Sequence, residues 1–241
     1  MGCLGQRQAA FPQGPLGNDA CRLIAPAVSL GPPVSDTLAS VPSFPQELFD
    51  PAAYAPAPPA GWLYQAGFLG LGEEAALVET IAGLPLQQAR YKAYTARRRV
   101  ASYGTRYEFS ANRLEAGPPL PPALWPLRAR AAAWLGVEPE DFVNVLVADY
   151  PVGTPLGWHR DVPDFDTVVG ISLLGTARLR FRPYPPERPS RRDLLSVELA
   201  PRLAYVLSGA ARWAWQHSVA PTREARQSIT LRTAARRAVR R

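Results

Sequence analysis

The chain of 241 residues is long enough for one domain with an appendage, and a hydrophobic content of 47% is ordinary for a folded core. No run approaches the roughly 18 apolar residues of a membrane span, and no secretory-signal pattern is present. A disulfide between the two cysteines, Cys3 and Cys21, would constrain little of the chain, so we expect a reducing, cytoplasmic setting. We also expect a monomer. The formal charge of +7 permits a polyanionic partner, although such an excess of arginine (Lys92 is the sole lysine) also arises from genomic base composition.

Residues 1–60 are rich in Pro, Ala and Gly, and neither the period of a strand nor that of a helix is present in them. They carry two arginines and four acids, a net charge of −2. The remaining residues therefore carry a net charge of +9, which gives the total of +7. We expect a flexible leader over 1–60, one domain over 61–233 and a basic tail over 234–241.

Two helices are predicted ahead of a β-rich region. Residues 72–83 begin with acids and place apolar residues at helical spacing, and residues 122–135 form a second helix in which Pro126 marks a break or the first turn. Short strands follow, at 143–150, 167–174, 177–184, 194–200, 203–209, 213–219 and 227–233. This order predicts an α+β fold with a mainly β core, a double-stranded β-helix (jelly roll) with helices packed outside it.

The chain has only two histidines, and both lie in this β-rich region. His159 stands two residues before Asp161 in GWHRD, so the two side chains share one side of an extended segment. A later strand can bring His217 across the barrel to them. Two imidazoles and one carboxylate leave coordination positions open, as Fe(II) oxygenases require, whereas a closed zinc site needs four ligands. An H-x-D triplet alone is common and is more often not a metal site.

The last predicted strand carries polar residues on one of its faces. In RQSITLRT, Arg226, Ser228, Thr230 and Arg232 alternate with apolar residues. Two guanidinium groups inside a barrel are costly unless they meet anions, and a dicarboxylate offers two. Surface ion pairs are the alternative for these arginines.

The segments DYPVGTPLGWHRD, VVGISLL and RQSITLRT, together with the region of His217, resemble the AlkB family of Fe(II)/2-oxoglutarate dioxygenases. The resemblance covers about residues 90–233. It implies Fe(II), 2-oxoglutarate and O₂, with His159, Asp161 and His217 as the metal ligands. It also implies contacts to 2-oxoglutarate from Tyr150, Arg226, Ser228 and Arg232, where either arginine takes either carboxylate.

The segment at 97–110, RRRVASYGTRYEFS, is similar to the part of AlkB proteins that covers the substrate. This similarity implies that Tyr103, Tyr107 and Phe109 stack on an extruded base. Alternating aromatic residues are equally typical of a strand core. The chain departs from the family at Ala148 and Ser228, which stand where asparagines are usual, and at Pro163, where repair members carry a carboxylate. Asp164 and Asp166 follow Pro163 and are placed to compensate.

The resemblance implies oxidative demethylation of alkylated DNA or RNA, as in DNA repair. Two alternatives stay open at this point. The same chemistry can act on a methylated protein or a small molecule, which Pro163 favours. A non-catalytic nucleic-acid-binding module would also use a basic barrel, but it has no need of the three metal ligands and both arginines.

Overall fold

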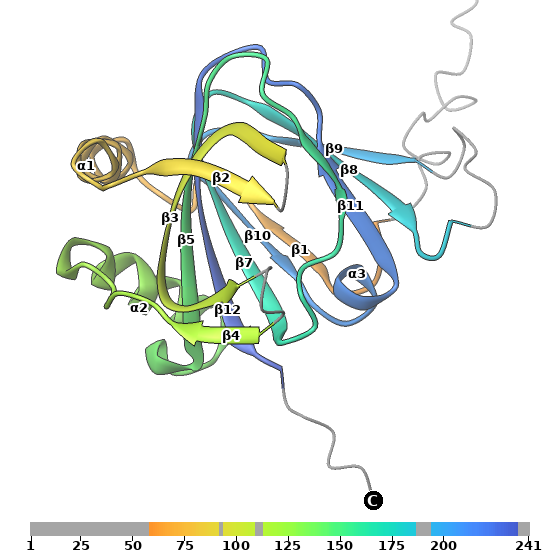
Figure 1. Ribbon diagram of the computed structural model, residues 1–241, viewed down its shortest axis with the longest axis horizontal. Coiled ribbons are helices and arrows are strands. Elements are labelled where there is room, and N and C mark those ends of the chain that lie inside the picture. The colour runs from red at the N-terminus through yellow and green to blue at the C-terminus, as the bar shows by residue number, and fades with distance from the viewer. Residues whose placement is uncertain (1–57, 92–93, 109–112, 187–193, 236–241) are drawn as a thin grey trace, which may run out of the picture. The chain divides into compact units, whose positions relative to one another are not determined.

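The computed structural model describes residues 58–91, 94–108, 113–186 and 194–235, all within one compact unit (Figure 1). The predicted leader lies outside the described residues as far as residue 57, and the predicted tail lies outside them from residue 236. Two antiparallel sheets and the helices beside them make up the described chain, which confirms the predicted jelly roll with helices on its outside.

The larger sheet has eight strands in the order β1-β10-β7-β12-β5-β3-β2, with β4 paired to β3. Its strands are β1 (Trp62–Gln65), β2 (Gln87–Tyr91), β3 (Tyr94–Glu108), β4 (Arg113–Ala116), β5 (Phe142–Tyr150), β7 (Phe165–Leu174), β10 (Leu203–Leu207) and β12 (Arg226–Ala234). The smaller sheet has the order β6-β11-β8-β9. Its strands are β6 (Leu156–His159), β8 (Ala177–Pro183), β9 (Leu195–Leu199) and β11 (Trp215–Val219).

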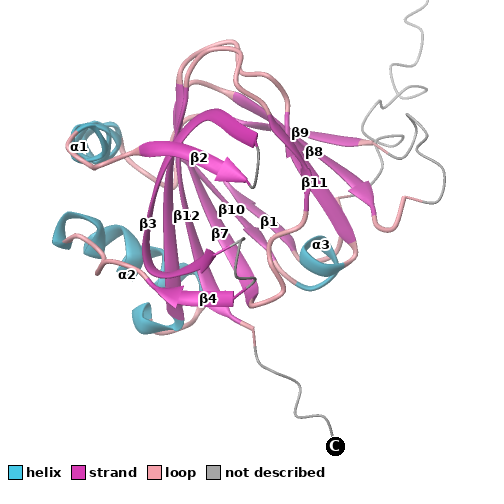
Figure 2. Cartoon of the chain, in the orientation of Figure 1, coloured by secondary structure: helices cyan, strands magenta, loops and turns pink. Residues whose placement is uncertain are grey.

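The helices cover the face of the larger sheet that is turned away from the smaller sheet (Figure 2). They are α1 (Leu71–Ala82) and α2 (Trp125–Leu135), with 3-10 turns at Pro122–Leu124 and Pro139–Asp141. Pro126 lies in the first turn of α2, where its missing N–H costs no hydrogen bond. No helix in the described part of the chain has the length and apolar character needed to cross a bilayer.

Period-two alternation gives each central strand one face for the core and one for the space between the sheets. Ile229 and Leu231 of β12 pack towards the helices, together with Val145 and Val147 of β5. The intervening residues of both strands point between the sheets, where they line a pocket. Leu179 and Phe181 of β8 help to close the far part of this space as a second apolar cluster.

The sequence did not indicate every element. Strands β1 to β4 and the short β6 were not predicted. In the structure none of the residues of β1, β4 and β6 is fully buried, so these strands carry no apolar alternation. The strand predicted over 213–219 begins only at Trp215, because α3 (Gly209–Trp213) precedes it. The side chain of Arg212 holds this helix in place, because its Nη2 donates to the carbonyl oxygens of Val162 and Phe165, both at 2.7 Å. A tertiary contact of this kind is invisible to local propensity.

One carboxylate on α1 ties the helix to two turns of the larger sheet. Glu74 is buried, and its Oε1 accepts a hydrogen bond from the backbone N–H of Leu174 at 2.9 Å. Its Oε2 pairs with Arg202 Nη1 at 2.8 Å. Leu174 and Arg202 both have φ of 63°, a left-handed conformation that is unfavourable for their side chains. Glu74 therefore holds two strained turn residues in place.

We expect Glu74→Ala to lower the free energy of unfolding by about 2 kcal/mol, since hydrogen bonds to a charged group are lost. Thermal denaturation should show a midpoint roughly 4–8 °C lower. Glu79→Ala, on the exposed face of the same helix, is the control and should leave the midpoint within about 2 °C. Equal midpoints for the two variants would contradict this role of Glu74.

Candidate active site

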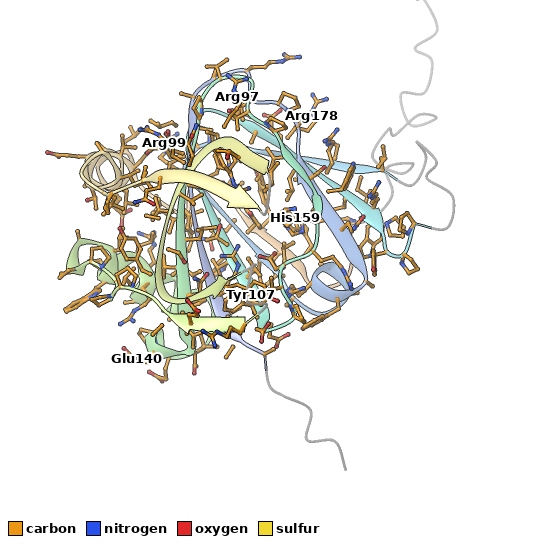
Figure 3. The ribbon with its side chains drawn as sticks, in the orientation of Figure 1. Arg97, Arg99, Tyr107, Glu140, His159 and Arg178 are labelled. Carbon is orange, nitrogen blue, oxygen red and sulfur yellow. The ribbon has the colours of Figure 1, made fainter. Side chains whose placement is uncertain are left out.

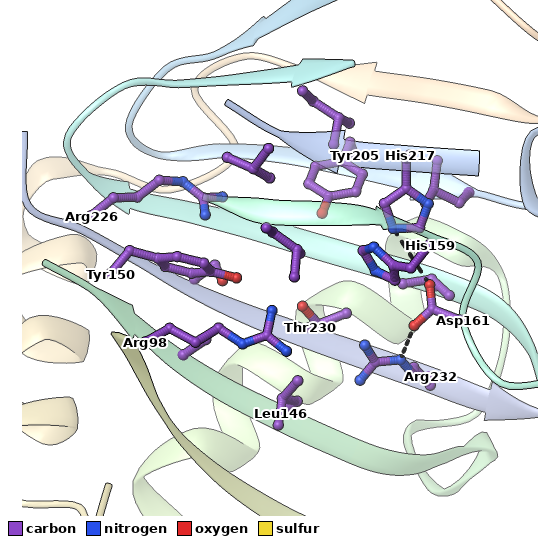
Figure 4. A pocket seen from close by; sticks show the side chains of 17 residues that line it. Arg98, Leu146, Tyr150, His159, Asp161, Tyr205, His217, Arg226, Thr230 and Arg232 are labelled. Atoms are coloured by element: carbon purple, nitrogen blue, oxygen red, sulfur yellow. Dashed lines mark hydrogen bonds and ion pairs between the residues drawn. The ribbon is translucent and has the colours of Figure 1, made fainter. Parts of the chain in front are cut away.

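The two histidines meet across neighbouring strands of the smaller sheet. His159 is the last residue of β6, and its pairing partner on β11 is His217, with the two ring centroids 4.2 Å apart. Asp161 lies two residues beyond the end of β6, and its carboxylate turns to the same place (Figure 4). One ligand atom from each of the three residues lies within 4.8 Å of the others.

Both imidazoles are prepared to act as ligands. His159 Nδ1 lies 2.8 Å from the carbonyl oxygen of Gly157, which can only accept, so Nδ1 carries the proton and Nε2 is left with its lone pair. Burial lowers the pKa of His159 and lowers that of His217 to about 3, and their neighbouring positive groups add to this effect. The rings are therefore neutral at physiological pH, the form that binds a metal.

A chain of polar contacts orients the third ligand. Arg232 Nε donates to Asp161 Oδ1 at 2.8 Å, and Arg232 Nη1 donates to Asn144 Oδ1 at 2.9 Å. Asn144 is itself held by Ser102 Oγ and by the backbone of Thr105. Burial alone would raise the pKa of Asp161, but Arg232 and the two imidazoles hold it below its ordinary range. Asp161 is therefore a fixed carboxylate whose Oδ2 faces His217.

The donor set fits one Fe(II). Two neutral nitrogens and one carboxylate oxygen are the ligands of the facial triad, and they leave the remaining positions for other molecules. Within the described residues this is the one cluster of at least three such side chains found, and it contains no cysteine and no fourth ligand. A closed structural zinc site does not match these ligands.

The pocket continues from the triad between the two sheets to a second cationic end. Arg226 is 2% exposed there, donates from Nε to Ser172 Oγ at 3.1 Å, and has its guanidinium 5.2 Å from the centre of the Tyr150 ring. Ser228 and Thr230 line the same pocket from β12. The structure thus brings all seven predicted metal and co-substrate residues to one cavity: Tyr150, His159, Asp161, His217, Arg226, Ser228 and Arg232.

One tyrosine of this pocket was not predicted from the sequence. Tyr205 of β10 lines the cavity near Arg226, and burial raises the pKa of its phenol to about 12, so it remains a neutral donor. Its ring lies over Gly170 of β7, where any Cβ would be 2.2 Å from the ring. Only glycine allows this contact. A glycine inside an otherwise apolar strand, in TVVGISLL, was the available signal for a close approach.

Two further residues of the site carried no usable signal in the sequence. Arg98 of β3 is buried and lines the cavity beside Tyr150, yet in the sequence it is one of three successive arginines (Figure 4). Asn144 of β5 acts on the site only through its hydrogen bond with Arg232, a residue distant in the chain. Among the residues that line the cavity, Asp161 is the one carboxylate, and three are arginines: Arg98, Arg226 and Arg232.

The predicted substrate aromatics are not gathered at the pocket. Tyr103 is 5% exposed within the hydrophobic core, so its prediction as a stacking residue gives way to the core interpretation. Tyr107 is half-buried near the end of β3, opposite Leu114 (Figure 3). Phe109 lies outside the described residues. Neither Tyr103 nor Tyr107 lines the cavity.

Asp164 and Asp166, which were expected to compensate for the absence of a carboxylate at Pro163, have other contacts in the structure. Pro163 is exposed, and Asp166 accepts a hydrogen bond from Trp213 Nε1 at 3.1 Å. Asp164 is half-buried, and its backbone carbonyl accepts from the N–H of Ala235 at 2.8 Å. Ala148 lines the pocket, as its predicted position near the co-substrate requires.

Comparison with known proteins agrees with this arrangement. The family model described as the 2OG-Fe(II) oxygenase superfamily matches residues 79–239. Among solved structures, OsALKBH1 is similar with a TM-score of 0.57 and 14% identity, over 72% of this chain and 96% of that chain. A prolyl-4-hydroxylase from Pseudomonas putida is similar with a TM-score of 0.51 and 17% identity, over 73% of this chain and 93% of that chain. No match was found among the curated proteins.

The site predicts that the purified chain binds one Fe(II), and that His159→Ala loses this binding because two ligands cannot hold the ion. Anaerobic titration with metal analysis of the desalted protein measures the stoichiometry. Gln216→Ala is the control, since Gln216 neighbours His217 on β11 but holds Arg182 on the other face. Iron retained by His159→Ala, or lost equally from the control, would contradict the assignment.

Proposed function

Because this chain belongs to the 2OG-Fe(II) oxygenase superfamily, we propose that it removes methyl groups from alkylated bases of DNA or RNA by oxidation. Membership makes it a 2-oxoglutarate-dependent dioxygenase that uses Fe(II), 2-oxoglutarate and O₂. The observation that supports a nucleic-acid substrate is charge: three arginines and one carboxylate line the pocket of a chain with a net charge of +7. The AlkB-like motifs and the fold similarity to OsALKBH1 agree with it.

The proposal assigns the metal to His159, Asp161 and His217. The register of β6 and β11 holds the two imidazoles side by side, and Arg232 fixes the carboxylate. These contacts orient the ligands before the metal arrives, and such supporting residues raise metal affinity. Bound Fe(II) with O₂ supplies the oxidation that converts 2-oxoglutarate to succinate and CO₂ and hydroxylates a substrate C–H bond.

We assign Arg226 to the far carboxylate of 2-oxoglutarate. Arg226 is almost fully buried, is held through Nε by Ser172, and so presents its remaining N–H groups as a fork to the cavity. Tyr150 and Tyr205 lie beside it, and their hydroxyl groups complete the anion's hydrogen bonds. Arg232 serves the metal end, because its guanidinium already contacts Asp161.

The substrate enters the part of the cavity that the co-substrate leaves open. A hydroxylated N-methyl group releases formaldehyde and leaves the free amine, so the protein needs no further acid or base of its own for this step. Arg98, which lines the same cavity and lowers the pKa of His159, adds positive charge that favours an anionic substrate.

A methylated protein side chain or a small molecule is the second candidate substrate. Pro163 supports it, because no carboxylate stands at the position where repair members of the AlkB family carry one. The similar fold of a prolyl-4-hydroxylase is consistent with it.

The test of the function is incubation of the full chain with Fe(II), ascorbate, 2-oxoglutarate and methylated single-stranded DNA or RNA. We expect succinate and formaldehyde in equal amounts, both dependent on the oligonucleotide and both absent with His159→Ala. Succinate without formaldehyde across a panel of methylated oligonucleotides would reject nucleic acid and favour the second candidate. Parallel incubations with methylated histone-like peptides would then test that candidate.

The assignment of Arg226 predicts that Arg226→Gln raises the KM for 2-oxoglutarate about 100-fold, since losing one side of a buried charge pair costs about 3 kcal/mol. Steady-state succinate release measures this change. Arg223→Gln, three residues earlier on the exposed side, removes the same charge and should leave the KM within about twofold. An unchanged KM in Arg226→Gln would show that another group binds the carboxylate.

A further inference from the structure

The outer face of the smaller sheet carries a row of arginines behind the metal centre. On β8, Leu179 and Phe181 point into the core, so Arg178, Arg180 and Arg182 point outward. On β6, which is separated from β8 by β11, Trp158 directly precedes His159 and therefore has the outward orientation. Figure 3 shows Arg178 and His159 on this side of the domain.

Two of these arginines are held flat against the sheet by neutral partners. Arg180 Nε donates to Ser218 Oγ at 3.1 Å, and Arg182 Nε donates to Gln216 Oε1 at 2.8 Å. Both guanidinium groups lie over the Trp158 ring, at 5.2 Å and 4.5 Å from its centre. Each guanidinium group thus uses only its Nε in a hydrogen bond, and its Nη atoms make none within the described residues.

The row continues past the end of β6. Arg160 stacks on Tyr184, with its guanidinium 3.7 Å from the ring centre, and donates to the carbonyl oxygen of Trp213 at 2.9 Å. Tyr184 and Trp213 are 41% and 38% exposed, so the row ends in accessible aromatic surface. We call Trp158, Arg160, Arg178, Arg180 and Arg182 the arginine–tryptophan face.

This face has no ion pair among the described residues, in contrast to Arg99 and Arg130 elsewhere on the surface. Arg99 pairs with Asp149 and Arg130 pairs with Glu73, each across a short distance. On the arginine–tryptophan face, the facing carboxylate is Glu198, opposite Arg178 in register, and it forms no salt bridge with it. Several like charges kept together, oriented and not neutralised are expected of an anion-binding surface.

We infer that the arginine–tryptophan face binds the phosphate backbone of a single-stranded nucleic acid. Residues two apart on a strand are separated by roughly 6.6–6.8 Å, so the three arginines of β8 form a row comparable to successive phosphates of an extended strand. Arginine binds phosphate with a planar fork, and exposed aromatic rings at the end of the row give bases a stacking surface.

This inference rests on the proposed function in one respect: the strand held here supplies the base that is oxidised. Trp158 and Arg160 flank His159 in the chain, so a bound strand runs past edge strand β6, on the other side of which the metal ligand lies. The arginine–tryptophan face would then contribute affinity, while the pocket selects the methylated base.

The test measures binding of a fluorescent, unmethylated single-stranded oligonucleotide to the full chain by anisotropy over a range of salt concentrations. Arg180→Gln/Arg182→Gln should weaken binding at least tenfold, and the slope of log affinity against log salt should fall by about 1.4, or about 0.7 for each lost phosphate contact. The matched control is Arg99→Gln/Arg130→Gln, which removes the same charge from ion-paired positions and should change affinity less than twofold.

Equal losses in the two double variants would overturn the inference, because general charge would then explain binding. Competition by polyglutamate but not by unlabelled oligonucleotide would overturn it in favour of an acidic protein partner. Binding of Fe(II) and the thermal midpoint report whether the variants fold. If the double variant does not fold, Arg178→Gln, which is exposed, should still lower the salt slope by about 0.7.

The binding assay and the formaldehyde assay fail separately. Face-dependent binding without formaldehyde from any methylated oligonucleotide supports this inference and rejects the proposed demethylation. Formaldehyde production with binding that does not depend on Arg180 and Arg182 supports the demethylation and rejects the role of the arginine–tryptophan face.

Discussion

The burial of the Asp161 carboxylate is the constraint on which the rest of the site depends. A lone buried carboxylate would be protonated or expelled, but Asp161 lies between Arg232 and two imidazoles. Arg232 in turn requires Asn144, which is fixed by β3. Strands β3, β5 and β12 of the larger sheet and strands β6 and β11 of the smaller sheet therefore converge on one charge. A metal ion completes this set, since it adds the positive charge that a carboxylate facing two neutral imidazoles can still accept.

The double-sheet fold makes this possible because each strand has two independent faces. On β12 and β5 one face builds the core under the helices, and the other provides the walls of the pocket. On β11 the division is similar: His217 points inward, whereas Gln216 and Ser218 hold arginines outside. Metal, co-substrate and the inferred nucleic-acid contacts can thus vary separately from the residues that stabilise the fold.

The sequence was informative where chemistry and period coincide. His159, Asp161 and His217 were predicted because the chain has only two histidines and one of them stands two residues before an aspartate. The polar face of β12 was predicted from alternation, and the jelly roll followed from the run of short strands. Tyr205, Asn144 and Arg98 could not be found in this way. Their roles depend on pairing between strands distant in the chain, as Tyr205 opposite Gly170 shows. Tyr103 was predicted as a stacking residue because an aromatic residue at strand spacing has the same sequence pattern in a core and in a binding site.

A crystal structure of the protein with Fe(II) and 2-oxoglutarate, prepared without O₂, tests the central claim most directly. The account predicts one anomalous iron peak bound by His159, Asp161 and His217, with the far carboxylate of 2-oxoglutarate on Arg226 beside Tyr150. An iron peak elsewhere, or 2-oxoglutarate bound with neither carboxylate on Arg226, would contradict it.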